Sequence, residues 1–321
     1  MTSPIPSPYR ARSVLLGGLL ALSLGLIGCA HAPSAPPQPA APEAVTLSHT
    51  FVHQLPASDS GRKYWLWVSV PRDYEQLKGK QLPVVFVTDA PYTLPLMRGI
   101  HAMVGNQGRN IEPFILVGLG YEPGLPQSGS RSRDYTPSNP LRKPDYRRDV
   151  YKAAAYGEAA RYRDYLERQV LPFVREHYRA DLSRSSFVGQ SYGGLFGAYV
   201  LLTRPELFQT YLLGSPSLWF DERAIWEIES RYAARHRDLK ARVRLYAGSF
   251  ETDRPEPRYT PGWNLLGDMN DFEALLRSRG YPGLEISSET LEGEDHRTMG
   301  PGFFTRGLLW ALPGYGPYDP S

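Results

Sequence analysis

The sequence has 321 residues, of which 41% are hydrophobic and 21% are charged. This composition is too apolar for a disordered protein and too charged for a protein with many membrane spans. Two of the 36 basic residues, Arg10 and Arg12, lie in a segment that we expect to be removed, which leaves 34 basic against 33 acidic residues. Nucleic acid is therefore not an expected partner, because binding to phosphates needs a concentrated basic surface.

Residues 1–28 are predicted to form an export signal. Arg10 and Arg12 precede an apolar run, residues 14–27, which is shorter than the roughly 20 residues that cross a bilayer as a stable helix. The run ends in Leu26-Ile27-Gly28-Cys29, which resembles a bacterial lipobox. The resemblance implies cleavage before Cys29 and diacylation at this residue. The alternative is a buried free thiol; because Cys29 is the only cysteine, it has no disulfide partner within the chain.

A proline- and alanine-rich linker, residues 29–45, is predicted to follow the signal. Its prolines favour extended backbone at about 3.1 Å per residue, so the linker is long enough to hold the next domain roughly 45 Å from a membrane. This N-terminus predicts an exported protein that a lipid anchors to the bacterial envelope. Ala30 after Cys29 favours the outer membrane, facing the periplasm.

The rest of the chain alternates between strand and helix patterns. The predicted strands are apolar runs bounded by turn residues, at residues 64–70, 82–88, 113–118, 186–188, 210–214, 241–247 and 284–291. The predicted helices are residues 157–177, 194–203, 223–235, 266–279 and 303–312. Apolar strands separated by helices predict a mostly parallel sheet with helices on both faces. We therefore expect one α/β domain over residues 46–312 and a C-terminal tail, residues 313–321.

The segment around Ser191 is the most informative about function. A predicted strand leads into Gly189-Gln190-Ser191-Tyr192-Gly193, and a helix begins after it. Glycines at the ends of this Gly-x-Ser-x-Gly motif avoid clashes where a strand turns sharply into a helix. Such a turn exposes the serine hydroxyl at a helix N-terminus, where backbone N–H groups can stabilise an oxyanion. We therefore predict that Ser191 is a nucleophile; the alternative is a structural serine in a turn.

His296 is the predicted general base. It follows the last predicted strand, in a loop before the last helix, whereas the other six histidines lie in the linker, on an N-terminal strand, before the serine or at helix ends. The chain order of serine, acid and histidine matches the α/β-hydrolase arrangement. The alternative is an exposed loop histidine.

The acid that orients this histidine should follow the strand at residues 241–247. Glu251 and Asp253 both lie in that loop. We favour Glu251 and keep Asp253 as the alternative. Either carboxylate could instead be a solvated loop residue.

Four segments resemble the bacterial putative-esterase family of the α/β-hydrolase fold, and especially its siderophore-esterase-like branch. They are residues 82–89 (LPVVFVTD), 131–137 (RSRDYTP), 186–221 and 291–298 (LEGEDHRT). The resemblance extends over roughly residues 46–312. It implies a Ser191 nucleophile, a His296 base and an acid at Glu251, although some siderophore esterases use only serine and histidine.

The resemblance also implies that the loop after Asp89 completes an oxyanion hole beside the N–H of Tyr192. Many relatives have Asp-Gly where this chain has Asp89-Ala90, and Pro91 follows. Because proline has no N–H, the second donor is expected from Ala90 or Tyr92.

The segment between residues 120 and 163 is rich in cations and is expected to be a long insertion near the mouth of the site. Acidic side chains are interspersed, so a solvated surface is one interpretation. The other is recognition of an anionic or catecholate-like substrate by Arg133 and its neighbours. Trp219 is expected to line an acyl or aryl pocket, unless it belongs to the core.

No motif predicts a metal or a cofactor: the sequence lacks paired cysteines and a phosphate-binding loop. The sequence as a whole predicts a lipid-anchored periplasmic serine esterase whose partners are a small-molecule ester and, through the lipid, the membrane. Siderophore-type or aryl esters are the expected substrates, cleaved through an acyl-enzyme. The alternatives are an acyltransferase on the same triad, a serine peptidase, and a catalytically silent envelope-binding lipoprotein.

Overall fold

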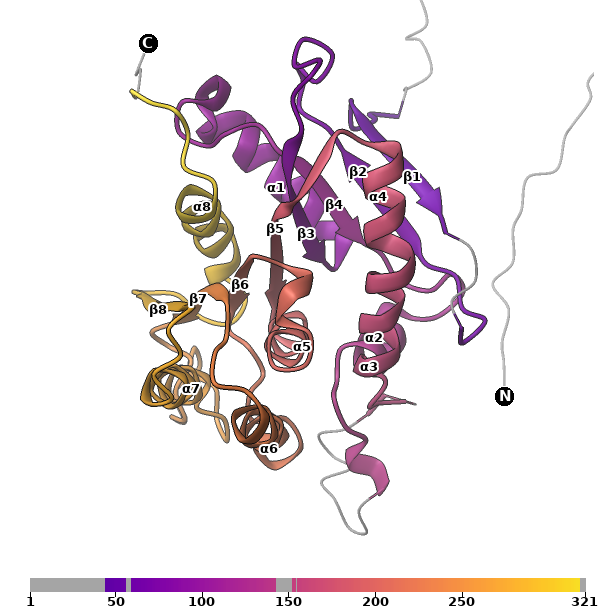
Figure 1. Cartoon of the computed structure of the whole chain (residues 1–321). Coiled ribbons are helices and arrows are strands. Elements are labelled where there is room, and N and C mark those ends of the chain that lie inside the picture. The colour runs from indigo at the N-terminus through magenta and orange to yellow at the C-terminus, as the bar shows by residue number, and fades with distance from the viewer. Residues whose placement is uncertain (1–43, 56–58, 143–151, 154, 318–321) are drawn as a thin grey trace, which may run out of the picture. The chain divides into compact units, whose positions relative to one another are not determined.

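The computed structural model describes residues 44–55, 59–142, 152–153 and 155–317 (Figure 1). The predicted signal peptide, Cys29 and the linker up to residue 43 lie outside these ranges, as do residues 143–151 of the cation-rich segment. Within the described ranges, no helix is long and apolar enough to span a bilayer.

An eight-stranded sheet runs through the unit that begins at Thr46, in the spatial order β1-β2-β4-β3-β5-β6-β7-β8. Strands β1 and β2 are antiparallel to their neighbours, and the strands from β4 to β8 are parallel. The strands are β1 Thr50–Gln54, β2 Trp65–Ser69, β3 Leu82–Thr88, β4 Ile115–Leu119, β5 Ala180–Gln190, β6 Thr210–Gly214, β7 Ala241–Gly248 and β8 Leu284–Leu291. Every residue of β3, β4 and β6 is buried, as a parallel sheet covered on both faces requires.

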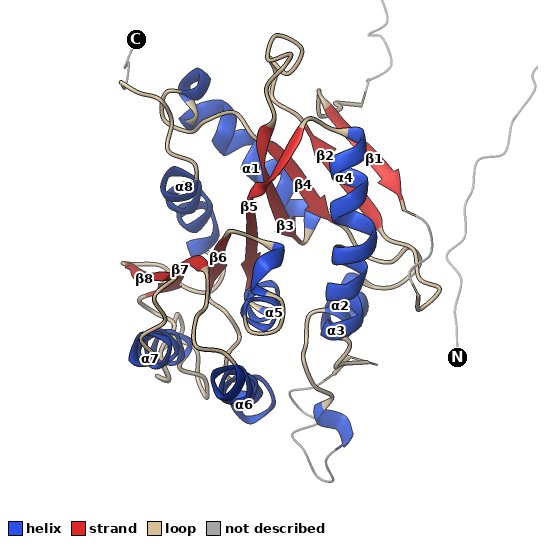
Figure 2. Cartoon of the chain, in the orientation of Figure 1, coloured by secondary structure: helices blue, strands red, loops and turns tan. Residues whose placement is uncertain are grey.

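Helices cover both faces of the sheet (Figure 2). Helices α1 (Ala90–Val104) and α8 (Met299–Ala311) share one buried apolar cluster with the strands. The second cluster holds the helices of the other face: α3 Ala159–Tyr165, α4 Leu171–His177, α5 Tyr192–Leu201, α6 Phe220–Arg235 and α7 Leu265–Ser278. Helix α2 spans Gln127–Asp134, and a π-helical turn, η3 (Leu166–Val170), joins α3 to α4. Short 3₁₀ turns are η1 Asn106–Gly108, η2 Pro140–Arg142 and η4 Pro205–Leu207. The predicted α/β class with a mostly parallel sheet is confirmed.

The sequence pattern missed helix α1. Pro91, Pro95 and Gly99 all lie within it, and each is unfavourable inside a helix. Pro91 is tolerated because it occupies the first turn, where a backbone N–H has no intrahelical acceptor. Strand β5 is also longer than predicted, because its polar first half continues the pairing with β3.

The parallel strands bring four loops to one edge of the sheet. Asp89 follows β3, Ser191 follows β5, Glu251 lies beyond the end of β7, and His296 lies beyond the end of β8. Because the carboxyl ends of parallel strands meet at the same edge, residues up to 207 positions apart in the sequence converge there.

Candidate active site

Ser191 occupies a strained turn between β5 and α5. Its backbone angles are φ 59° and ψ −120°, a region that non-glycine residues rarely adopt. A Cβ atom on Gly189 would lie 2.3 Å from the carbonyl oxygen of Gly193. A Cβ atom on Gly193 would lie 2.3 Å from Thr88 Oγ1 at the end of β3. Both glycines of the motif are therefore required by close packing around the serine.

The neighbouring strand holds the backbone of this turn. The N–H of Ser191 donates to the carbonyl of Gly214 at 2.9 Å, and the N–H of Ser217 donates to the carbonyl of Ser191 at 3.2 Å. The Ser191 hydroxyl lies 3.4 Å from Ser217 Oγ. Ser191 and His296 line the same cavity, of about 480 Å³. The strained turn thus presents the hydroxyl to a cavity that also holds the predicted base.

Glu251 and His296 form a hydrogen-bonded pair. His296 Nδ1 lies 2.8 Å from Glu251 Oε2, and Glu251 is completely buried. The other carboxylate oxygen accepts hydrogen bonds from the Ser215 hydroxyl at 2.5 Å and from the Gly248 N–H at 2.9 Å. With a proton on Nδ1 donated to Glu251, the Nε2 atom of His296 can accept a proton.

Asp253 lies elsewhere in the same loop. Its side chain is exposed, and Oδ1 accepts a hydrogen bond from the N–H of Gly262 at 2.7 Å. Asp253 therefore stabilises the loop. The sequence did not decide which of the two acids faces His296, and in the structure Glu251 is the one that contacts the imidazole.

The loop that carries His296 is fixed by its neighbours. Asp295 Oδ1 accepts hydrogen bonds from the N–H groups of Arg297 and Thr298 at 2.9 and 3.1 Å. Burial raises the pKa of the Asp295 carboxyl, but these N–H groups and Arg258 outweigh burial and lower it, so the carboxylate stays ionised. The side-chain amide of Gln190 donates to the carbonyl of His296 at 2.8 Å, which ties the serine turn to the histidine loop.

Two helix N-termini meet beside Ser191. Ala90 and Tyr192 are the first residues of α1 and α5, so their N–H groups have no intrahelical acceptor. The N–H of Tyr92 instead donates to the carbonyl of Asp89 at 3.2 Å. Tyr92 lines the cavity. Of the two backbone donors that we expected from this loop, the N–H of Tyr92 is already bonded, so the N–H of Ala90 remains the candidate oxyanion donor.

Arg131 is a site residue that the sequence reasoning missed. Its Nε donates to Asp89 Oδ1 at 2.9 Å, its Nη2 donates to the carbonyl of Gln190 at 3.1 Å, and its side chain lines the cavity. The Tyr121 hydroxyl donates to the same Asp89 oxygen at 2.5 Å. Burial lowers the pKa of Arg131, but the charge of Asp89 outweighs burial and raises it, so the guanidinium stays charged beside Ser191. Arg131 is the first residue of the RSRDYTP segment, one of the four that resemble the esterase family. Its place in that segment is the sequence feature that could have identified it as a site residue.

Arg133, which we expected to contact substrate, lies outside this cavity. It is only 6% exposed, and its guanidinium binds both carboxylate oxygens of Asp134, at 2.7 and 2.8 Å, and Glu122 at 2.7 Å. Residues two apart on a helix are about 200° apart around its axis, so Arg131 and Arg133 point to different sides of α2. These contacts give Arg133 a place in the fold, and a role for it in substrate binding stays a prediction.

Trp219 is partly buried and packs against the larger apolar cluster. Its ring centroid lies 5.3 Å from that of Trp263 and 6.4 Å from that of Tyr192. Trp219 is not among the residues that line the cavity at Ser191. Its position matches the core interpretation more closely than the pocket interpretation.

The cavity at Ser191 is polar and cationic. Arg131 and Arg297 line it together with two tyrosines, and no carboxylate does so among the described residues. In the same ranges, no group of three or more histidine, cysteine or acidic side chains is arranged to hold a metal ion.

A family model described as "Putative esterase" matches residues 57–284. The chain belongs to this esterase family. The ferri-bacillibactin esterase BesA of Bacillus subtilis (strain 168) is 28% identical over 282 residues, which are 86% of this chain and 93% of BesA. The siderophore triacetylfusarinine C esterase of Aspergillus fumigatus is 25% identical over 270 residues, or 78% of this chain and 89% of that enzyme. The esterase is thus a carboxylic ester hydrolase.

A solved structure shares the fold of the esterase. The BES protein from Bacillus cereus superposes with a TM-score of 0.72 at 22% sequence identity, covering 85% of this chain and 99% of that protein. This similarity identifies the domain as an α/β-hydrolase fold and confirms the predicted fold class.

Proposed function

We propose that the esterase is a serine hydrolase in which Ser191, His296 and Glu251 form the catalytic triad. The Glu251–His296 pair carries the proposal. A buried carboxylate that accepts three hydrogen bonds is costly to build around an ordinary loop histidine, and it favours the imidazolium that forms when a histidine takes a proton. The pair lies beside a serine in the strained turn typical of a nucleophile.

Ser191 Oγ attacks the ester carbonyl while its proton moves to His296 Nε2. The hydroxyl contacts Ser217 Oγ in the structure, and the bond to Nε2 forms as substrate enters, since catalytic hydrogen bonds tighten in the complex. His296 then protonates the leaving alcohol, and an acyl-enzyme remains on Ser191. Water, deprotonated by His296, hydrolyses this ester and restores the serine.

The oxyanion forms between two helix N-termini and one cation. The N–H groups of Ala90 and Tyr192 are the backbone donors that support this role, and Arg131 adds a fixed positive charge. Asp89 and the Gln190 carbonyl hold that guanidinium in place before the reaction, so little reorganisation is needed as charge develops.

For the substrate, we propose a siderophore-type ester with anionic, aromatic groups. Arg131 and Arg297 favour an anion, the rings of Tyr92 and Tyr121 offer apolar faces, and no carboxylate of the described residues lines the cavity to repel it. The names of two relatives, which are siderophore esterases, point to the same class.

The test combines covalent labelling with hydrolysis. A fluorophosphonate probe should label the wild-type protein and fail to label Ser191→Ala, whose kcat should fall by about three to six orders of magnitude. Ser217→Ala removes the neighbouring hydroxyl and is the matched control; it should retain labelling and lose less than about tenfold in kcat. A ferric trilactone siderophore should be cleaved with a higher kcat/KM than a neutral p-nitrophenyl ester. Labelling of Ser191→Ala at the wild-type rate would refute the nucleophile.

We also propose that the chain is acylated at Cys29 and held by lipid at the periplasmic side of the outer membrane. The support is the sequence Leu26-Ile27-Gly28-Cys29 and the linker after it. Wild-type protein should incorporate labelled palmitate and fractionate with membranes, and Cys29→Ser should do neither. Unlabelled wild-type protein in the soluble fraction would contradict the anchor.

A further inference from the structure

Ser215 is a completely buried residue in a strained turn directly after strand β6. Its φ angle is 40°, a positive value that residues other than glycine rarely adopt. The N–H of Ser215 donates to the carbonyl of Tyr246 on β7 at 2.6 Å, which holds the turn in this conformation. Strained residues persist where the surrounding contacts compensate for the strain, and they cluster at active sites. The side chain of Ser215 is therefore a candidate for a functional contact.

The hydroxyl of Ser215 contacts the carboxylate that is paired with His296. It donates to Glu251 Oε1 at 2.5 Å, whereas Glu251 Oε2 lies 2.8 Å from His296 Nδ1. The N–H of Gly248 also donates to Oε1, at 2.9 Å. Two donors on Oε1 restrict rotation of the carboxylate about its last bond, so Oε2 is held toward the imidazole.

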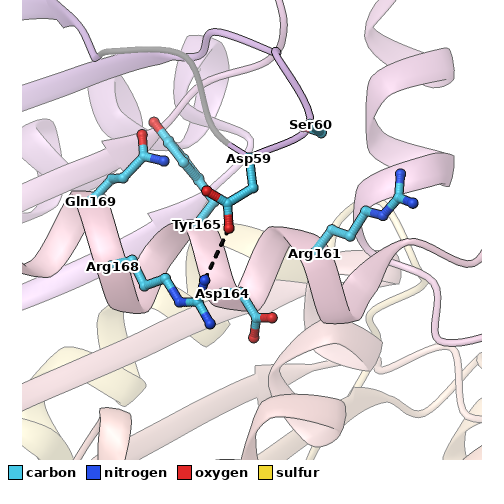
Figure 3. Close-up of a pocket in the computed structure, with 7 residues that line it drawn as sticks. All are labelled: Asp59, Ser60, Arg161, Asp164, Tyr165, Arg168 and Gln169. Carbon is cyan, nitrogen blue, oxygen red and sulfur yellow. Dashed lines mark hydrogen bonds and ion pairs between the residues drawn. The ribbon is translucent and has the colours of Figure 1, made fainter.

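An exposed carboxylate of the same protein shows why these donors matter. Asp59 Oδ2 accepts from Arg168 at 2.9 Å beside helix α3, and the Asp59 side chain is 80% exposed, so water also stabilises its charge (Figure 3). Glu251 is 0% exposed, and no lysine or arginine among the described residues pairs with it. Because burial removes water from this carboxylate, the neutral donors Ser215 and Gly248 take the place of water.

The turn that contains Ser215 also contacts the turn of the nucleophile. Two residues later, the N–H of Ser217 donates to the carbonyl of Ser191 at 3.2 Å. Pro216 lies between them against the start of α5, where a Cβ atom on Gly194 would lie 3.0 Å from Pro216 Cα. The backbone of this turn thus fixes the serine, and one side chain of the turn fixes the acid. A substitution at Ser215 can remove the second contact and leave the first.

We propose that Ser215 is a positioning residue of the esterase, whose hydroxyl holds the Glu251 carboxylate toward His296 and takes up part of its charge. This role rests on the proposed triad of Ser191, His296 and Glu251. Ser215 does not line the cavity at Ser191, so it acts through Glu251 and not on the substrate. Without the hydroxyl, Oε1 retains only the N–H of Gly248. The carboxylate is then less firmly oriented, and its charge acts more strongly on the imidazolium.

Steady-state kinetics of Ser215→Ala and Ser215→Gly on p-nitrophenyl acetate test this role. Both substitutions should lower kcat by about 10- to 100-fold, because one charge-assisted hydrogen bond is lost. KM should stay within about threefold of wild type, since the cavity is unchanged. Glycine adopts a positive φ without strain, so Ser215→Gly separates loss of the hydroxyl from backbone strain. Urea unfolding gives the folded fraction to which each kcat is referred.

Ser185→Ala is the matched control. Ser185 lies within β5, is completely buried, and donates through its hydroxyl to the carbonyl of Leu207 at 3.4 Å. The substitution removes a buried hydroxyl that contacts no member of the triad. Its kcat should stay within about threefold of wild type.

The pH profile is a measurement that a purely structural role of Ser215 would not change. The midpoint at which kcat/KM rises should lie about half a pH unit or more higher in Ser215→Ala than in wild type. The reason is that a carboxylate with one donor fewer holds the proton of the imidazolium more strongly. Arg131 and Arg297 in the cavity, and Asp295 next to His296, are the same in both proteins and contribute equally to both midpoints. Ser185→Ala should keep the wild-type midpoint.

A double-mutant cycle with Glu251→Gln separates failure of this role from failure of the triad. In the Glu251→Gln background, Ser215→Ala should change kcat by less than about threefold, because no carboxylate is left to position. The positioning role is overturned if both Ser215 variants keep the wild-type kcat, if the midpoint does not move, or if Ser215→Ala costs as much in either background. Wild-type activity of Glu251→Gln would instead refute the triad itself.

Discussion

The two sides of helix α2 show how differently two arginines in one turn can be used. Arg131 lies beside Ser191 and joins Asp89 to the carbonyl of Gln190, whereas Arg133 is buried among Asp134, Glu122 and Tyr64. In the proposed mechanism Arg131, which pairs with the buried Asp89, holds a charge where an oxyanion would form. Arg133 neutralises carboxylates away from the cavity at Ser191. Residue type and sequence position are almost the same, so the direction of the side chain decides the role.

The loop after β7 repeats the contrast with two acids. Glu251 is completely buried and contacts His296, whereas Asp253 is exposed and bonds to the N–H of Gly262. In both pairs, one member serves the cavity at Ser191 and the other stabilises local structure. Substitutions that separate activity from stability can therefore test the comparison.

The largest difference is expected within the acid pair. Glu251→Gln should reduce kcat by up to about 10⁴-fold, because the amide no longer favours the imidazolium or the correct tautomer. Asp253→Asn should change kcat by less than about threefold, since the loop retains an acceptor for Gly262. Steady-state kinetics on p-nitrophenyl acetate measures both. The reverse pattern would transfer the role to Asp253, and no effect of either change would favour a Ser191–His296 dyad.

The next largest effect is expected for Arg131→Met. Loss of a fixed charge at the oxyanion should lower kcat by about 10²- to 10³-fold and leave KM for neutral p-nitrophenyl acetate nearly unchanged. A neutral ester separates this effect from attraction of an anionic substrate. Arg297→Met, which removes a cation from the same cavity, is the control and should change kcat on this ester by less than about threefold. Equal losses in the two variants would mean that Arg131 acts only as a surface charge.

Arg133→Met should lower stability strongly and activity little, the opposite of Arg131→Met. It leaves the buried carboxylate of Asp134 without its cation, which should lower the free energy of unfolding by about 3–5 kcal/mol. Activity per molecule, titrated with fluorophosphonate, should stay within about threefold of wild type, since Arg133 does not reach the cavity at Ser191. Urea unfolding measures the stability. A large fall in kcat with normal stability would return Arg133 to substrate binding.

The sequence predicted the sheet better than it predicted the site. Strands β3, β6 and β8 match their predicted bounds. The apolar runs of β3 and β6 between turn residues have few other stable arrangements. Helix α1 was missed because local propensity disfavours Pro95 in a helix interior, and packing against the sheet overrides that preference.

Which residues reach the cavity at Ser191 depends on how their side chains are oriented, and sequence patterns show this only in part. The Gly-x-Ser-x-Gly motif led to Ser191, and chain order led to His296, since both signals are local or topological. Sequence alone did not separate Glu251 from Asp253, and it singled out Arg133 where Arg131 reaches the cavity. The orientation of a loop carboxylate or of one helix face is set by packing between segments far apart in the chain.

The smallest predicted effect is the pH dependence of stability that comes from Glu158, which contacts Arg133. Glu158 binds Arg62 through both carboxylate oxygens, and its N–H donates to the carbonyl of Arg133 at 2.9 Å. Burial raises the pKa of Glu158, but the hydrogen bonds and charge of Arg62, with Arg161 and Arg133, outweigh burial and lower it. The folded state therefore binds this proton less readily than the unfolded state does. The stabilisation is complete above the ordinary glutamate pKa of about 4.3 and is lost as the pH falls through that value to the lower pKa of the fold.

Glu158→Gln should therefore lower the free energy of unfolding by about 1 kcal/mol at neutral pH, and its difference from wild type should shrink as the pH falls from about 5 to 3. Urea unfolding at several pH values measures this difference. The control is Glu227→Gln, which removes an exposed pair with Arg231 on α6 and should give a small difference at every pH, because solvent screens that pair. A difference for Glu158→Gln that grows as the pH falls would reverse the sign of the pKa shift. Such a result would also remove Glu158 and Arg62 from the charges that stabilise the fold beside Arg133.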